Sequence, residues 1–208
     1  MIDRDYKAPM GILAHGMLYM TAYKDGTQYL LRRERWGDHD AVAAESVLPI
    51  AASDEVPAGF AFLGSSYALA CAIQRDETTY IYRSQDNGQT WKEMAAVAGM
   101  LYPALYCDGR YLWHAGYTAS SLQGAPGRVS VSQYDITTPN LTLVSGPVIV
   151  GPSDSGRPGI LRNPLNWALI VLTPKTSEWT VSGATPGIAE FKSTNLGTTW
   201  SLVTIHAV

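Results

Sequence analysis

Cysteine, charge and long apolar runs are all scarce in this sequence. The two cysteines, Cys71 and Cys107, lie in apolar surroundings without a CxxC pair or a histidine at metal-binding spacing, so we expect two buried free thiols and no zinc site. Only 16% of the residues are charged and the formal net charge is -3. Because this balance gives no long-range attraction to a phosphate backbone, nucleic acid is not an expected partner.

Segments that would direct the chain to a membrane are also missing. No apolar run reaches the ~20 residues that a membrane-spanning helix needs, and the N-terminal MIDRDYKAPM lacks the hydrophobic stretch of a signal peptide. We therefore expect a soluble chain without membrane insertion. Phosphate-loop, dinucleotide and metalloprotease motifs are absent as well, so we expect no cofactor and no metal.

Turn-forming residues are abundant, and short alternating stretches lie between them. The chain has 19 glycines, 12 prolines and 12 tyrosines, and stretches such as TTYIYRS and RVSVSQY alternate apolar and polar residues. This pattern is typical of many short strands joined by tight turns, and no stretch has the spacing of an amphipathic helix. The sequence therefore predicts an all-β protein.

Four segments of the chain repeat one pattern. An apolar residue recurs in register at Ile12, Phe60, Leu105 and Ile160, and a turn former follows each of them. The repeat defines units of roughly 45 to 55 residues, each long enough for four antiparallel strands that cannot bury both faces alone and must stack on a neighbour. We place the units at about residues 9–50, 57–97, 101–150 and 157–208, within a single domain of residues 1–208.

Two of these units carry one octapeptide between their third and fourth strands, SQDNGQTW from residue 84 and STNLGTTW from residue 193. The pattern SxDxGxTW resembles the Asp-box of bacterial neuraminidase repeats, which occur in sialidases and other β-propellers. The resemblance implies a small β-propeller of four four-stranded blades, with a structural turn in which the second copy has asparagine in place of aspartate. The turn residues are Ser84, Asp86, Gly88, Thr90, Trp91, Ser193, Asn195, Gly197, Thr199 and Trp200.

The order of the units predicts how such a ring would close. The first unit begins with its own inner strand and the fourth ends with its own outer strand, so we expect those two units to meet only through side-chain packing. A ring of four is crowded at its axis. Small residues stand where the inner strands would crowd, at Gly11, Gly59, Ala104 and Gly159.

Catalysis is not the favoured expectation. The segment RPGI at Arg157 resembles the arginine-containing motif of sialidases, but it lies in the fourth unit rather than the first, and sialidases have six blades. Retaining glycoside hydrolysis needs two facing groups at a fixed separation, and the sequence nominates no such pair. The expectation is therefore a non-catalytic binding or assembly module, and the alternative is a glycan-processing, sialidase-like hydrolase on a reduced propeller.

The resemblance also implies a binding face, formed by the loops that enter each first strand and join the second strand to the third. Four residues of these loops are candidates for binding a glycan or protein partner: Trp179, which could stack on a sugar, and Arg75, Arg128 and Arg157, which could meet an acidic group. A phage virion component, such as a tail, fibre or receptor-binding protein assembled into a larger particle, fits these features. The location of the chain is left open, with a virion as one candidate.

Overall fold

The computed structural model describes residues 7–14, 17–24, 27–33, 44–47, 58–63, 68–86, 88–119, 127–138, 140–153, 157–175 and 187–207. These residues form strands and turns only, and they include no helix that is long and apolar enough to span a bilayer. The prediction of an all-β chain is therefore confirmed.

The strands form four antiparallel sheets of four strands each, and every sheet is built from one continuous part of the chain. The first sheet contains β1 (Lys7–Ala14), β2 (Met17–Lys24), β3 (Thr27–Arg33) and β4 (Ala44–Val47). The second contains β5 (Ala58–Phe62), β6 (Leu69–Arg75), β7 (Thr78–Ser84) and β8 (Lys92–Ala98). The third contains β9 (Leu101–Cys107), β10 (Tyr111–Thr118), β11 (Gly127–Asp135) and β12 (Thr142–Ser153). The fourth contains β13 (Gly159–Arg162), β14 (Leu169–Lys175), β15 (Gly187–Ser193) and β16 (Ser201–Ala207).

Two apolar clusters hold neighbouring sheets together. Between the second and third sheets, Ile81 packs with Leu105 and Leu112, and all three side chains are buried. Between the third and fourth sheets, Trp113 and Phe191 belong to a second buried cluster. Along β14 and β15 every second residue is buried, which is the period that places alternate side chains on one face of a strand. The alternation read from the sequence therefore buries the faces that meet between sheets.

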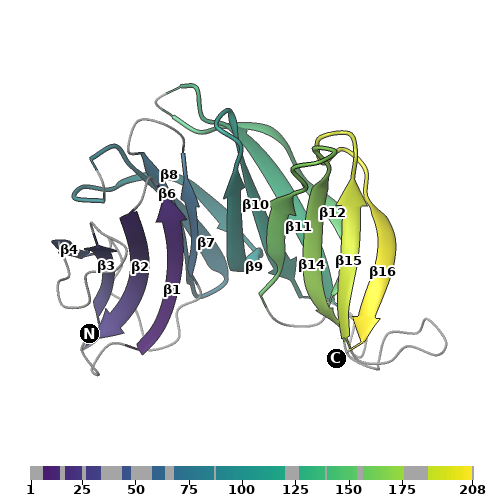
Figure 1. Cartoon of the computed structure of the whole chain (residues 1–208), viewed down its shortest axis with the longest axis horizontal. Helices are drawn as coiled ribbons and strands as arrows, with labels where there is room; N and C mark the ends of the chain where they lie inside the picture. Colours follow the sequence, from purple (N-terminus) through teal and green to yellow (C-terminus); the bar gives the residue numbers. More distant parts are fainter. Residues whose placement is uncertain are drawn as a thin grey trace.

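The four sheets follow one another along an open arc. The first strands of successive sheets are in contact, β1 with β5, β5 with β9, and β9 with β13. The first sheet, in purple, and the fourth sheet, in yellow and green, stand at opposite ends of the molecule (Figure 1). The expected closed ring of four blades, with a seam between the first and fourth units, is therefore not observed. Closure would need a quarter turn between neighbouring sheets, and their rotation is set by packing between faces, which strand periodicity does not specify.

Only part of the expected crowding at the inner strands is present. A Cβ atom on Gly59 would lie 2.7 Å from the carbonyl oxygen of Pro103, which is closer than neighbouring atoms allow. At Gly159 the nearest atom would be the Cβ of Leu172 at 3.8 Å, an ordinary contact. The prediction of crowding is wrong at Gly159 because the open arc leaves space there, and Gly11 lies outside the residues whose side chains are described.

The two cysteines differ in their surroundings. Both are free; Cys71 is fully buried, whereas Cys107 is only half-buried at the end of β9. Burial raises the pKa of the Cys107 thiol to about 11, although the backbone N–H of Gly109 partly offsets the rise. The expectation of two buried thiols is therefore confirmed for Cys71 and wrong for Cys107, which is the last residue of β9 and lies next to the turn that follows.

Candidate functional site

The turn between β7 and β8 is organised by Ser84 and Asp86. The Asp86 carboxylate accepts hydrogen bonds from the Thr90 backbone N–H at 2.9 Å and from the Thr90 hydroxyl at 2.6 Å, while the Ser84 hydroxyl donates to it at 2.7 Å. Gly88 has a φ of 81°, which a glycine adopts without strain, and it donates to the Ser84 Oγ at 2.7 Å. Partial burial raises the pKa of Asp86, but the hydrogen bonds from Thr90 and Ser84 outweigh it and lower that pKa below its usual value.

The turn between β15 and β16 has the same architecture with an amide in place of the carboxylate. The Asn195 Oδ1 accepts from the Thr199 backbone N–H at 2.9 Å and from the Ser193 hydroxyl at 2.9 Å. Its Nδ2 donates to the Thr199 hydroxyl at 2.8 Å, so the side-chain bond runs in the direction opposite to that of the first turn. The indole of Trp200 donates to the Gly197 carbonyl at 3.0 Å, as Trp91 does to Gly88 at 3.0 Å. The two octapeptides thus form two turns with the same architecture. We call this end of the sheets the Asp-box end.

The opposite end, which we call the loop end, carries three of the four predicted binding residues. Arg75 ends β6, Arg128 is the second residue of β11, and Arg157 lies just before β13, so they come from the second, third and fourth sheets. All three residues are exposed, and desolvation of the Arg157 guanidinium lowers its pKa below the ordinary value. The fourth candidate, Trp179, lies outside the described residues. Two exposed carboxylates, Asp76 and Glu77, lie in the turn after Arg75.

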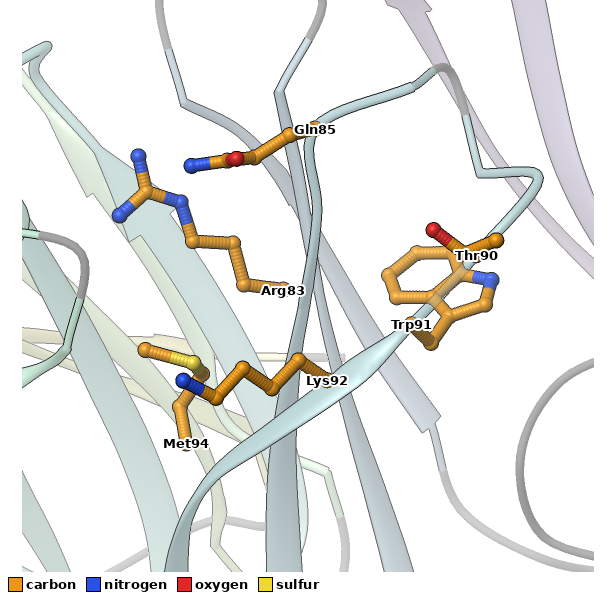
Figure 2. A pocket seen from close by; sticks show the side chains of 6 residues that line it. All are labelled: Arg83, Gln85, Thr90, Trp91, Lys92 and Met94. Carbon is orange, nitrogen blue, oxygen red and sulfur yellow. The ribbon is translucent and has the colours of Figure 1, made fainter.

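A cavity of about 220 Å³ lies at the Asp-box end of the second sheet. Figure 2 shows Arg83, Gln85 and Lys92 extending toward one side of it, with the Trp91 ring on the other. The Arg83 guanidinium donates to the Thr138 carbonyl of the third sheet at 2.9 Å. Sequence reasoning did not find this cavity. Its only sequence signal is that two cations, Arg83 and Lys92, flank one turn at paired positions. The cavity is lined by Arg83, Gln85, Thr90, Trp91, Lys92 and Met94.

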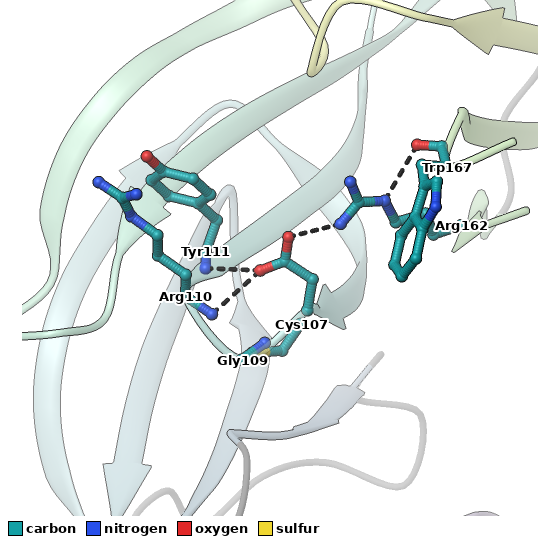
Figure 3. A network of polar contacts seen from close by, with 7 residues as sticks. Cys107, Gly109, Arg110, Tyr111, Arg162 and Trp167 are labelled. Atoms are coloured by element: carbon teal, nitrogen blue, oxygen red, sulfur yellow. Dashed lines mark hydrogen bonds and ion pairs between the residues drawn. The ribbon is translucent and has the colours of Figure 1, made fainter. Parts of the chain in front are cut away.

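A second polar network at the Asp-box end connects the third and fourth sheets (Figure 3). Asp108, in the turn after β9, accepts hydrogen bonds from the backbone N–H of Tyr111 at 2.8 Å and from Arg162 at 2.7 Å. Arg162 also donates to the Trp167 carbonyl at 3.0 Å, and its guanidinium carbon lies 4.8 Å from the Trp167 ring centroid. The residue Trp167 is 66% exposed. The network fixes a turn of the fourth sheet against a turn of the third.

Comparison with solved structures identifies the fold, whereas no family model and no curated protein matches the chain. An α-L-arabinofuranosidase of Fusarium graminearum superposes with a TM-score of 0.63 and 13% identity over 96% of this chain and 67% of that one. The NanB sialidase of Streptococcus pneumoniae gives a TM-score of 0.54 and 16% identity over 79% of this chain and 26% of that one. A bifunctional GH43-CE protein of Bacteroides eggerthii gives 0.59 and 12% over 98% of this chain and 26% of that one. The chain therefore has a sialidase-like propeller fold and spans about a quarter of the length of the sialidase.

These similarities correct the expectation of a non-catalytic module. The similar structures, at 12 to 18% identity, include a sialidase, an arabinofuranosidase and other glycoside hydrolases, so the fold is one that carries glycan-processing enzymes. The sequence does not by itself indicate this likeness to hydrolases, because its loop segments contain no recognisable catalytic motif. The expected virion role finds no support in these comparisons.

Proposed function

We propose that this chain is a glycan-processing hydrolase of the propeller type that binds an anionic glycan at its loop end. In this proposal its four sheets are the blades of one domain, residues 1–208. The observation that supports it is the placement of three cations, Arg75, Arg128 and Arg157, at the same end of three neighbouring sheets. Guanidinium groups form paired hydrogen bonds with carboxylate and sulfate groups, which neutral sugars lack.

The chemistry of glycoside hydrolysis requires a proton donor for the leaving oxygen and a second group on the other side of the sugar. Among the described residues of the loop end, the carboxylates available for these roles are Asp76 and Glu77. Other acidic residues belong by sequence to segments that join strands at this end, namely Asp25, Asp54, Glu55, Asp154 and Glu178. The catalytic pair is proposed to come from these seven carboxylates.

Turnover of a panel of sialylated, uronate-containing and neutral glycosides tests this function. We expect release of the free sugar from an anionic glycoside, and loss of that release when one of the seven carboxylates is changed to its amide. Glu93→Gln, on β8 near the Asp-box end, is the matched control and should leave turnover unchanged. Absence of turnover across the panel, or turnover that survives all seven amide substitutions, would contradict the proposal.

A further inference from the structure

Four of the six residues that line the cavity at the Asp-box end are not required by its turn. The turn itself is explained by the hydrogen bonds of Ser84, Asp86, Gly88 and Thr90, and none of these depends on Arg83, Gln85, Lys92 or Met94. The turn between β15 and β16 provides the comparison, because it has an equivalent architecture, with one side-chain bond reversed, and other residues at these four positions. Those residues are Lys192, Thr194, Ser201 and Val203.

The lining combines two cations with an aromatic wall. The Lys92 Nζ donates to the Asn140 side-chain oxygen at 3.3 Å, and Arg83 donates to a carbonyl, so within the described residues neither cation is paired with a carboxylate. The Nε of Arg83 is buried and has no acceptor among these residues. Asp86, the nearest acidic residue in the turn, is engaged by Thr90 and Ser84.

The remaining lining residues suit the ring of a sugar. The half-exposed Trp91 ring stands across the cavity from the two cations, held by its own N–H bond to the Gly88 carbonyl. Gln85 adds an exposed amide, which can both donate to and accept from hydroxyl groups. An aromatic face with polar groups at its edge binds the apolar face of a pyranose and the hydroxyls around it.

We infer that this cavity is a second saccharide site, specific for a single sugar residue that carries a carboxylate. The sugar ring lies against Trp91, and its carboxylate is directed to Lys92 and Arg83. The volume of about 220 Å³ is below the roughly 300 to 1,000 Å³ of sites for drug-sized ligands, which suits the enclosure of one sugar unit. The site lies at the end opposite to the loop end, so it is independent of the proposed catalytic function.

Binding of D-glucuronate to the full chain tests the inference, measured by titration calorimetry and by the shift of the Trp91 indole N–H signal in NMR spectra. D-Glucose has the ring without the carboxylate, and acetate has the carboxylate without the ring. We expect saturable binding of glucuronate and binding of neither control at the same concentrations. No binding of glucuronate, or equal binding of glucose or of acetate, would overturn the inference.

The second Asp-box turn indicates a residue that can replace Lys92 without disturbing the turn between β7 and β8. Lys92→Ser introduces the residue of the equivalent position in the fourth sheet, Ser201, and should weaken glucuronate binding by about tenfold through loss of one charge-assisted contact. Lys192→Ser, in the equivalent hairpin, is the matched control and should leave binding unchanged. Equal affinities in the two variants, with melting temperatures unchanged, would place the ligand elsewhere and refute the site.

Discussion

The burial of His114 predicts that the stability of the protein depends on pH. Substitution of this one residue separates its contribution from that of the other titratable groups. It lies on β10, opposite Leu105 and Ser132, and its side chain is fully buried in the seam between the second and third sheets. Neither ring nitrogen has a hydrogen-bond partner in the described part of the protein. Burial lowers the pKa of the imidazole from 6.5 to about 4, so the folded state holds it neutral.

The sign and size of the effect follow from linkage. Below its ordinary pKa of 6.5 the imidazole takes up a proton in the unfolded chain but not in the folded one, so stability is complete above pH 6.5 and falls as the pH decreases toward 4. Each pKa unit corresponds to about 1.4 kcal/mol, which gives a loss of about 3 kcal/mol over this interval. Tyr134, in the same seam, is neutral over this interval because its ordinary pKa of 10.0 lies far above it, and burial raises that pKa further.

Urea unfolding of the wild type and His114→Leu at pH 7.5 and pH 4.5 measures this loss. Leucine removes the unpaired polar atoms at similar volume, so the variant should match or exceed the wild type at pH 7.5. Between the two pH values the wild type should lose about 2 to 3 kcal/mol more than the variant, since the carboxylates contribute equally to both. Parallel pH dependences in the two proteins would refute the reasoning.

Three further predictions concern the turns and the inner strands. Asp86→Ala should lower the free energy of unfolding by about 1 to 2 kcal/mol in urea titrations, because it removes acceptors of three hydrogen bonds; an unchanged melting temperature with loss of binding would assign Asp86 to a site instead. Asn195→Asp should be accepted by the second turn with a melting temperature close to that of the wild type, since the first turn holds a carboxylate in the same place, and a large decrease would show that the turns are not equivalent. Gly59→Ala should destabilise by roughly 1 to 3 kcal/mol, whereas Gly159→Ala should cost much less, because only the first introduces a close contact, with Pro103 O at 2.7 Å; equal losses in thermal unfolding would contradict this difference.

Strands and turns could be predicted from sequence because both depend on local chemistry. The stretch TTYIYRS coincides with β7, Thr78–Ser84, since its alternation and the octapeptide after it fix where the strand runs and ends. The next strand, β8, begins only at Lys92, because Thr90 and Trp91 of the octapeptide belong to the turn. Local pattern thus identified the elements, and hydrogen bonds within the turn set the boundary.

Features that depend on how sheets meet could not be predicted. The two cations of the cavity beside Trp91, Arg83 and Lys92, donate hydrogen bonds to Thr138 and Asn140, which lie in a turn of the next sheet and are far away in sequence. The open arc likewise depends on rotations between packed faces. Strand periodicity indicates neither the contacts between sheets nor the rotation of one sheet relative to the next. The loop-end position of Arg128, by contrast, follows directly from its place at the start of a third strand.

Turnover of an anionic glycoside by three proteins tests the central proposal most directly: the wild type, Arg128→Gln at the loop end, and Arg110→Gln at the Asp-box end. Both arginines are exposed, so each substitution removes one surface charge and should leave the melting temperature unchanged. We predict turnover by the wild type and by Arg110→Gln, and a value of kcat/KM about tenfold lower for Arg128→Gln, the loss expected for one guanidinium contact to the substrate. Equal turnover by all three proteins, or none by the wild type, would contradict an anionic glycan processed at the loop end.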